Sequence, residues 1–290
     1  MKVVVKGDGI KLKDVDSFNL RHIFECGQAF RWRADGRGYI GVVNQRVIRV
    51  VKDDEDIILE NATLDDYKNI WHDYFDLGRD YSKIKQRLKK SDNKIKEPIA
   101  FGGGIRILNQ DPWEILISFI ISAMNNISRI GKTIDNISRR FGDPIYFEGE
   151  TFYAFPRPNV LANASKEDFR SCGCGYRDKY ILETAKMVAK DEIALYTLIE
   201  RGYEEAFNYL LQFPGVGPKV ADCICLFALK KHEAFPVDVW IKRIMEEIYH
   251  DGKEMKISEV GKMARDRFKD LAGFAQQYLF YYAREHGIGK

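Results

Sequence analysis

The segment QFPGVGPKVADCIC (Gln212–Cys225) places several groups that could do chemistry at one turn of the chain. Gly215 and Gly217 allow a sharp change of direction, and Pro218 suits the first turn of a following helix. The uncovered N–H groups of such a turn, together with the helix dipole, can bind a phosphate without reading a base. Lys219 adds an amine beside this anion site. A purely structural turn between two helices would use the same glycines.

Two common phosphate-binding patterns do not account for this turn. The Walker pattern requires a hydroxyl residue after the lysine, but Val220 follows Lys219. A dinucleotide-binding fingerprint requires a third glycine and a preceding strand, whereas the preceding sequence YEEAFNYLLQF has the spacing of a helix. The pattern therefore predicts two helices joined by a tight turn over about residues 203–230.

The chain that follows can bring a carboxylate back to the lysine. A helix from Pro218 to Lys230 would rise roughly 18 Å. An extended segment from Lys231 to Val237 would reach about 23 Å. Asp238 would then lie near the lysine, at the expected N-cap of a helix over residues 238–250.

The composition is that of a soluble globular chain of 290 residues, with 45% hydrophobic and 31% charged residues. The formal net charge of +3 permits a polyanionic partner without requiring one. The first residues lack a signal-peptide pattern, and the longest apolar stretch, Trp113 to Met124, is too short to span a bilayer. We expect no membrane association, and a location in the nucleoid-containing cytoplasm of a prokaryote or in the nucleus of a eukaryote.

The five cysteines indicate reduced thiols. Four of them form two C-x-C pairs, a spacing that disfavours a disulfide within each pair. The chain has no CxxC pair and no Cys/His cluster, so we expect no structural zinc site. The cysteines are Cys26, Cys172, Cys174, Cys223 and Cys225.

The pattern of hydrophobic residues predicts an α+β chain with two parts. In residues 1–105, the runs FNLRHIFECGQAFRWRADGRGYIGVV, RVIRVV and DIILE indicate an antiparallel sheet, followed by a helical piece from about Leu64 to Leu88. In residues 106–290, apolar residues recur every three to four positions from Pro112 onward, which indicates a mostly α-helical region. The basic run Lys83 to Lys96 is either a solvated helix end or a strip that follows phosphates.

The hairpin and the segment around Asp238 carry a family resemblance. The sequence FPGVGPKVADCICLFAL followed by FPVDVWIKRI resembles the helix-hairpin-helix and Gly/Pro-rich–Asp signature of base-excision DNA glycosylases. More narrowly, VADCICL with PVDV is similar to the 8-oxoguanine DNA glycosylases. Further similar segments follow in family order over most of the chain: ECGQAFRWR, FIISAMNNISRI, CGCGYRDKYI and AGFAQQYLF. The resemblance implies a monomer that acts on duplex DNA containing 8-oxoguanine, with cytosine as the expected opposite base.

The resemblance makes Lys219 the nucleophile and Asp238 its carboxylate partner. A neutral amine can attack C1′ of the sugar, and a nearby carboxylate can stabilise the positive charge that develops as the glycosidic bond breaks. The resulting Schiff base can eliminate the 3′ phosphate. We therefore expect a bifunctional DNA N-glycosylase and AP (apurinic/apyrimidinic site) lyase. A surface lysine beside an ordinary helix cap is the alternative for these two residues alone.

The resemblance also implies how the flipped base is read. The Gly27 carbonyl would accept a hydrogen bond from N7–H, which 8-oxoguanine has and guanine lacks, although a glycine at a strand bend would look the same. Cys223 and Phe280 would lie on the two faces of the purine, and Gln276 would contact its edge. Pro236 completes the implied pocket. Without the family match, a cysteine or phenylalanine at helical spacing would indicate core packing.

Other residues would hold the DNA. By resemblance, Asn125 and Asn126 would fill the gap left by the flipped nucleotide, Arg129 and Arg177 would read the opposite cytosine, and Tyr176 would press into the base stack. The glycine turn and the start of its second helix would contact the phosphates through Gly215, Gly217 and Val220. Trp240, in the helix that follows Asp238, is a further DNA-binding position.

Two residues depart from the family pattern. Met124 replaces the first asparagine of the family's Asn-rich wedge, and Trp240 replaces a histidine that touches a phosphate near the lesion. Both departures put the corresponding contacts in doubt. The strictness of the opposite-base preference therefore stays open at the level of sequence.

No cofactor is expected to be required. The resemblance allows a monovalent or divalent cation at the hairpin, held by the backbone carbonyls of Leu211, Phe213 and Val216. An iron–sulfur cluster, which many related enzymes bind through four C-terminal cysteines, is not expected because no cysteine follows Cys225.

Two alternatives stay open on the sequence alone. One is a glycosylase/lyase for oxidised pyrimidines, which would also use a nucleophilic lysine. The other is a non-catalytic DNA-binding module that keeps the hairpin for phosphate contact; it would leave the pairing of Lys219 with Asp238 unexplained. The branches for mismatched adenine and alkylated bases lack the lysine.

Overall fold

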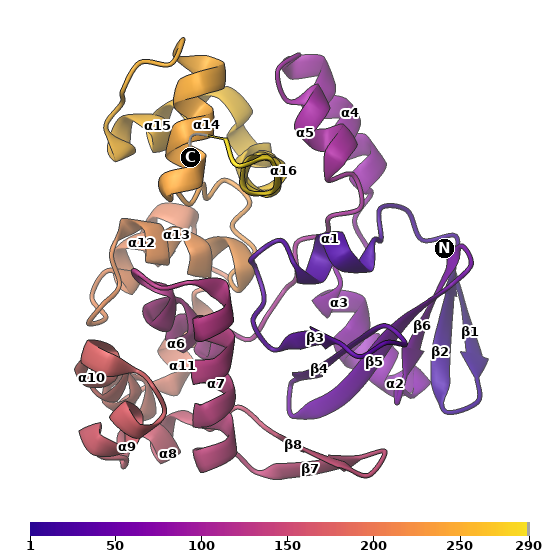
Figure 1. Ribbon diagram of the computed structural model, residues 1–290, viewed down its shortest axis with the longest axis vertical. Coiled ribbons are helices and arrows are strands. Elements are labelled where there is room, and N and C mark those ends of the chain that lie inside the picture. Colours follow the sequence, from indigo (N-terminus) through magenta and orange to yellow (C-terminus); the bar gives the residue numbers. More distant parts are fainter. Residues whose placement is uncertain (289–290) are drawn as a thin grey trace.

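A computed structural model describes residues 1–288. Its N-terminal part is built on a six-stranded antiparallel sheet in the order β1-β2-β6-β5-β4-β3 (Figure 1). The central residue Val50 pairs with Tyr39 on one side and Leu59 on the other, and it is completely buried. The predicted α+β class with an N-terminal antiparallel sheet is confirmed. The strands are β1 (Lys2–Lys6), β2 (Gly9–Lys13), β3 (Trp32–Ala34), β4 (Tyr39–Val43), β5 (Arg46–Asp53) and β6 (Asp56–Glu60).

The start of the sheet differs from the prediction. The run FNLRHIF was interpreted as a strand, but Leu20–Phe24 forms the helix α1. Asn19 caps this helix, because its side chain accepts a hydrogen bond from the N–H of His22 at 3.1 Å. Leu20, Ile23 and Phe24 have i, i+3, i+4 spacing, which is the helical period. The strands β1 and β2, which precede this segment, were not predicted.

The helical piece expected from Leu64 to Leu88 is interrupted. A short helical stretch ends at Tyr74, and Asp76 has a left-handed φ of +50°. Asp80 then caps a new helix by accepting a hydrogen bond from the N–H of Lys83 at 3.0 Å. The elements are α2 (Leu64–Asp66), the π-helical turn η1 (Tyr67–Trp71), α3 (His72–Tyr74), α4 (Tyr81–Ser91) and α5 (Lys96–Phe101).

The rest of the chain is mostly helical, as predicted. The helices α4 and α5 pack with this region, since their buried residues belong to its hydrophobic core (Figure 1). All five cysteines are buried and carry free thiols. Within residues 1–288, no helix is both long and apolar enough to cross a membrane. The helices are α6 (Pro112–Ser122), α7 (Ile127–Phe141), α8 (Pro158–Ala162), α9 (Lys166–Ser171), η2 (Gly175–Arg177), α10 (Asp178–Lys190), α11 (Glu192–Thr197), α12 (Tyr203–Leu210), α13 (Pro218–Phe227), α14 (Val239–Tyr249), α15 (Ile257–Phe268), η3 (Lys269–Leu271) and α16 (Ala272–His286).

A two-stranded hairpin that was not predicted joins the two parts. Strands β7 (Pro144–Phe147) and β8 (Glu150–Tyr153) extend from the end of α7 toward the sheet (Figure 1). Phe147 of the hairpin packs against a small cluster of buried residues in β4 and β5. Arg49 of β5 forms an ion pair with Glu148 at the hairpin tip at 2.7 Å. The hairpin therefore ties the sheet to the helical region.

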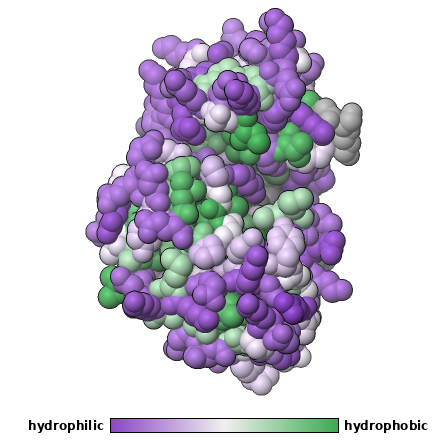
Figure 2. Space-filling view, turned by 90° about the vertical axis from the view of Figure 1, so that its left-hand side faces the viewer, coloured by the Kyte–Doolittle hydropathy of each residue, from purple (hydrophilic) through white to green (hydrophobic). Residues whose placement is uncertain are grey.

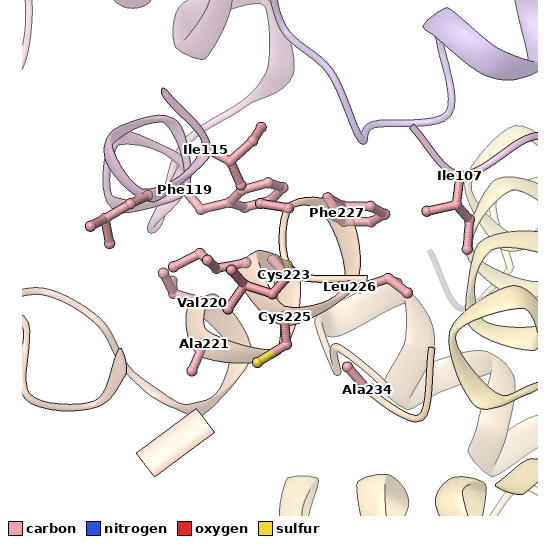
Figure 3. Packing of buried hydrophobic residues seen from close by; sticks show 14 of the residues in the cluster. Ile107, Ile115, Phe119, Val220, Ala221, Cys223, Cys225, Leu226, Phe227 and Ala234 are labelled. Carbon is pink, nitrogen blue, oxygen red and sulfur yellow. The ribbon is translucent and has the colours of Figure 1, made fainter. Parts of the chain in front are cut away.

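The helix that carries the predicted lysine is deeply packed. Figure 3 shows Ile115 and Phe119 of α6 facing Val220, Cys223 and Phe227 of α13. The rings of Phe119 and Phe227 stack with centroids 5.6 Å apart. On the molecular face shown in Figure 2, hydrophobic side chains gather across the middle among hydrophilic surroundings. The packing of α13 against α6 fixes where α13 begins.

Gln28 links the predicted base-reading segment to the start of the helical region. Its side chain is fully buried and makes three hydrogen bonds. Nε2 donates to the carbonyls of Ile23 and Arg106 at 2.9 and 2.8 Å, and Oε1 accepts from the N–H of Leu108 at 2.9 Å. Because Gln28 follows Gly27 directly, this clamp holds the Gly27 backbone in place.

We expect Gln28→Leu to lower the free energy of unfolding by about 3 kcal/mol, because it leaves the Leu108 N–H and the Arg106 carbonyl buried without partners, while the Ile23 carbonyl keeps a bond from the Cys26 thiol. Urea denaturation followed by circular dichroism would measure the change. Gln110→Leu is the control, since Gln110 donates only one hydrogen bond to this segment, to the Gln28 carbonyl at 2.8 Å. Equal denaturation midpoints for Gln28→Leu and the wild type would contradict the clamp.

Candidate active site

The helix α12, a tight turn and the helix α13 form the hairpin that the glycine pattern predicts. Gly215 has a φ of +83°, and a Cβ there would lie 2.9 Å from the ring of Tyr180. Both the conformation and the close packing therefore require glycine. Gly217 is the N-cap of α13 and provides no side-chain cap. The first N–H groups of α13 are thus left available to an anion.

A cavity of about 50 Å³ lies beside the start of α13. Its walls come from segments that are far apart in the sequence, including the segment after α1, the helices α6, α13 and α16, and the loop before α14. Both residues of the predicted catalytic pair line it, and so do all five residues of the predicted base pocket. The lining residues are Gly27, Phe119, Lys219, Cys223, Phe227, Pro236, Asp238, Gln276, Gln277 and Phe280.

Asp238 occupies the predicted N-cap of α14. Its Oδ1 accepts a hydrogen bond from the N–H of Ile241 at 2.9 Å. Burial raises the pKa of Asp238, while the N–H groups of Ile241 and Trp240 and the nearby charge of Lys219 oppose the rise. The helix start thus stabilises the ionised carboxylate in a site that would otherwise favour the neutral acid.

The amine of Lys219 lies between an aromatic ring and a thiol. Its Nζ is 5.1 Å from the centroid of the Phe119 ring. Burial raises the pKa of the Cys223 thiol to about 12, and Lys219 opposes the rise through its charge and through a hydrogen bond with the thiol. Cys223 is therefore a neutral thiol at physiological pH, next to the amine and one helical turn after it, as predicted.

The base side of the cavity is closed in this structure. Gly27 has a φ of +85°, and a Cβ there would lie 2.9 Å from Cε1 of Phe280, so the Phe280 ring rests on the glycine. On the same helix, Gln276 is buried and its Nε2 donates to the Pro236 carbonyl at 3.2 Å. A space of about 50 Å³ holds only one or two water molecules. A purine can enter only if these walls separate.

Comparison with known proteins identifies the family. Residues 10–116 match the 8-oxoguanine DNA glycosylase N-terminal domain, and residues 117–270 match the HhH-GPD superfamily of base-excision DNA repair proteins. A probable N-glycosylase/DNA lyase of Methanothermobacter thermautotrophicus is 37% identical over 74% of this chain and 74% of its own length. The chain belongs to the 8-oxoguanine glycosylase/lyase family.

Further relatives agree with this assignment. The N-glycosylase/DNA lyase of Saccharomyces cerevisiae is 33% identical over 79% of this chain and 68% of that protein. The crystal structure of Clostridium acetobutylicum 8-oxoguanine glycosylase/lyase, in complex with double-stranded DNA containing cytosine opposite 8-oxoguanine, superposes with a TM-score of 0.96. That protein is 42% identical, and the alignment covers 99% of both chains. The chain is accordingly a bifunctional DNA glycosylase and AP lyase.

Three wall residues of this glycosylase site were missed in the sequence. Phe119 and Phe227 were assigned to helices without a role, and Gln277 was not considered. The spacing of four between Lys219 and Cys223 finds residues on one helix face, but it does not find side chains contributed by another helix. For Phe119 the available signal was its place in the family segment FIISAMNNISRI.

The loop predicted to enter the DNA presents a different side chain from the one expected. Asn126 caps α7 by accepting from the N–H of Arg129 at 2.9 Å, and Asn125 donates to the Ile121 carbonyl at 3.2 Å. Both asparagines are therefore engaged in the local backbone. Met124 instead is 95% exposed, with a left-handed φ of +50°. It is the residue that projects from this loop.

The two predicted cytosine readers differ in their surroundings. The guanidinium of Arg129 is exposed and makes no hydrogen bond or ion pair within residues 1–288. Arg177 is buried, and it donates from Nε to the Ala123 carbonyl at 3.0 Å and from Nη2 to the Met124 carbonyl at 3.3 Å. Tyr176 lies beside it, exposed, with its hydroxyl 3.5 Å from the Ala123 carbonyl. Arg177 thus holds the Met124 loop in the free protein.

Trp240 occupies the first turn of α14 and is half-buried against the helical core. The Arg243 guanidinium lies 6.0 Å from the Trp240 ring centroid. Its indole therefore packs on the protein, while the backbone N–H of Trp240 stabilises the Asp238 carboxylate.

We predict that Lys219→Gln raises the pKa of Asp238 further above its ordinary value, because it removes the nearby positive charge that lowers this pKa. Titration of the ¹³C-labelled carboxyl by NMR would measure the shift. In the wild type, base release needs ionised Asp238 and should therefore fall as the pH drops through the raised pKa of this carboxyl. Lys242→Gln is the control, since Lys242 pairs with Glu246 at 2.8 Å. A lower Asp238 pKa in Lys219→Gln would contradict the coupling.

Proposed function

We propose that the cavity beside α13 is where this chain releases 8-oxoguanine from duplex DNA, with cytosine as the opposite base. The observation that supports the site is the meeting of Lys219 and Asp238 with Gly27, Gln276 and Phe280 on the walls of one cavity. The Clostridium acetobutylicum neighbour binds double-stranded DNA with cytosine opposite 8-oxoguanine. Duplex DNA of that kind is the inferred substrate here.

In the proposed mechanism, Lys219 attacks C1′ of the flipped nucleotide as a neutral amine. The glycosidic bond breaks, and its electron pair leaves with the base. Asp238 stabilises the positive charge that develops on the sugar, and the N–H groups of Ile241 and Trp240 keep its carboxylate available. The amine attached to C1′ then forms a Schiff base with the opened sugar, from which the 3′ phosphate is eliminated.

Recognition of the base would use the opposite wall. The Gly27 carbonyl is held by the neighbouring Gln28 clamp, so it can test for the N7–H of 8-oxoguanine without moving. The purine would displace the Phe280 ring from Gly27 and lie between that ring and the Cys223 thiol. Gln276 would contact the edge of the base.

The hairpin would bind the DNA backbone. Gly215, Gly217 and the N–H of Val220 lie at the uncapped start of α13, where a phosphate oxygen is favoured. The carbonyls of Leu211, Phe213 and Val216 are hard oxygen donors that suit a bound monovalent or divalent cation. The Phe213 carbonyl already accepts from the N–H of Val216 at 3.1 Å and retains a second lone pair. Such a cation would add positive charge at the turn and would favour a DNA phosphate there.

The exposed loop after α6 would fill the gap left by the flipped nucleotide. Met124 follows Phe119 of the cavity wall by five residues, and its exposed apolar side chain is of a kind that can wedge between bases. Asn125 and Asn126 would support this wedge from the backbone side. Arg129 would read the opposite cytosine directly, whereas Arg177 would act mainly by holding the loop.

Lys219→Gln is expected to abolish base release while the protein stays folded and binds 8-oxoguanine DNA. Borohydride should trap the wild type on a duplex with 8-oxoguanine opposite cytosine, and no adduct should form with the variant. Duplexes carrying thymine glycol or no lesion are the substrate controls. Trapping on the pyrimidine lesion alone would favour a different glycosylase, and full turnover by Lys219→Gln would rule out the amine as the nucleophile.

Met124→Ala should slow single-turnover base release about tenfold, as expected when one apolar side chain of the base-flipping machinery is lost. Met124→Leu should keep most of the rate, because it retains an apolar side chain of similar volume. Met187→Ala on α10 is the control, since Met187 is another exposed methionine far along the chain from this loop. A wild-type rate in Met124→Ala would contradict the wedge.

A further inference from the structure

The base cavity is lined by a second glutamine, Gln277, which has no part in the proposed mechanism. Gln277 follows Gln276 on α16 and also lines the cavity. Its side chain is only 2% exposed. Burying a primary amide costs free energy unless its polar atoms find partners. The partners of Gln277 therefore indicate what its amide does.

Three groups form a chain of hydrogen bonds with one possible direction. The Pro236 carbonyl can only accept, so the NH₂ group of Gln276 must face it, and Nε2 donates at 3.2 Å. The oxygen of Gln276 then faces the other way and requires a donor. Nε2 of Gln277 supplies this donor at 2.8 Å from Oε1 of Gln276. The amide of Gln276 is thus held at both ends.

The other end of the Gln277 amide is unpaired. Its Oε1 is buried and has no hydrogen-bond partner among residues 1–288. An apolar side chain of the same length would avoid the cost of this oxygen, so packing alone does not explain a glutamine here. What the amide supplies and an apolar side chain cannot supply is the N–H that reaches Gln276. We propose that Gln277 is a positioning residue that fixes the direction of the Gln276 amide toward the flipped base.

A fixed direction has a consequence for selectivity. With both bonds in place, Gln276 retains one N–H and one lone pair, and their order along the cavity wall cannot reverse. A guanine-type edge offers an acceptor at O6 and donors at N1 and N2, whereas an adenine-type edge offers a donor at N6 and an acceptor at N1. The held amide therefore favours one type of edge over the other. This inference rests on the proposed contact between Gln276 and the base.

The test compares two lesions that share the same oxidised ring. 8-Oxoguanine and 8-oxoadenine both carry N7–H, so the proposed Gly27 contact is the same, and only the edge read by Gln276 differs. Single-turnover base release is measured for each lesion opposite cytosine. Gln277→Met, which removes the donor and nearly keeps the volume, should lower the 8-oxoguanine to 8-oxoadenine rate ratio about tenfold, as expected for one lost oriented hydrogen bond. Gln276→Met should lower it at least as much.

The double variant Gln276→Met/Gln277→Met decides between positioning and packing. If Gln277 acts through Gln276, the double variant has the ratio of Gln276→Met alone, because the second change then has nothing left to orient. Additive effects would overturn the proposal. Tyr278→Phe is the matched control: it removes a neighbouring buried hydroxyl that also lacks a partner, and it should leave the ratio unchanged.

Two further outcomes distinguish a failure of the positioning role of Gln277 from a failure of the proposed contact between Gln276 and the base. A changed ratio in Gln276→Met with an unchanged ratio in Gln277→Met would overturn the positioning role and leave the base contact of Gln276 intact. An unchanged ratio in both, with base release preserved, would overturn the contact itself and the inference that rests on it. If Gln277→Met does not fold, Gln277→Asn serves instead, since it keeps an amide but withdraws it from Gln276 by one methylene. The same fall in ratio is then expected.

Discussion

The convergence of two helix starts on one cavity is the constraint on which the rest of this structure depends. Lys219 stands in the first turn of α13, and Asp238 is the N-cap of α14. Positive potential at both starts favours an ionised carboxylate and attracts phosphate, while burial acts in the opposite direction on the carboxylate. Each residue alone would be an ordinary feature of a helix end. Their chemistry follows from the approach of the two ends.

That approach is maintained by α16, which packs against the loop between the two helices. A Cβ on Gly273 would lie 2.3 Å from Cδ1 of Leu226, and the Gly273 N–H donates to the His232 carbonyl at 2.7 Å. One turn later, Gln276 reaches the Pro236 carbonyl, two residues before Asp238. The helix that carries the residues proposed to contact the base is therefore the same helix that holds the loop leading to Asp238. Movement of α16 would change both the base pocket and the position of this loop.

Without DNA, this unit is closed and its polar groups are largely paired within the protein. The Phe280 ring covers Gly27, and the Arg177 guanidinium donates hydrogen bonds to carbonyls of the Met124 loop. Entry of a base must therefore exchange existing contacts for new ones. A base that offers fewer compensating contacts stabilises the open form less, so closure of the free site contributes to selectivity.

Sequence and structure agree most closely where the determining interactions are local. The glycine turn, the Pro218 helix start and the one-turn spacing from Lys219 to Cys223 all follow from backbone rules over a few residues. The strand prediction for FNLRHIF was wrong because its apolar residues also fit helical spacing. The Asn19 cap stabilises the helix α1 there. The β7–β8 hairpin depends on distant packing against the sheet, which no local pattern encodes.

The candidate site divides in the same way. The residues predicted for catalysis and for the base pocket all lie on the cavity wall, but the roles proposed for Gln277 and Met124 could not be predicted. Gln277 is a neighbour of Gln276 in sequence, where a helix normally turns successive side chains about 100° apart. Only the observed hydrogen bond shows that they meet. The exposure of Met124 likewise depends on where the two adjacent asparagines place their side chains.

The loop after α6 contains an unfavourable conformation, and the contacts that support it explain why it persists. Met124 combines a strained φ with a fully exposed apolar side chain, an arrangement that costs on the order of 1–3 kcal/mol for the backbone alone. This conformation is held because Arg177 donates hydrogen bonds to the carbonyls of Ala123 and Met124. If the Arg177 side chain turned away to bind a cytosine, it would give up these bonds and release the loop. Arg177 therefore holds Met124 outward in the free protein, and under the proposed function Arg129 is left as the direct reader of the opposite base.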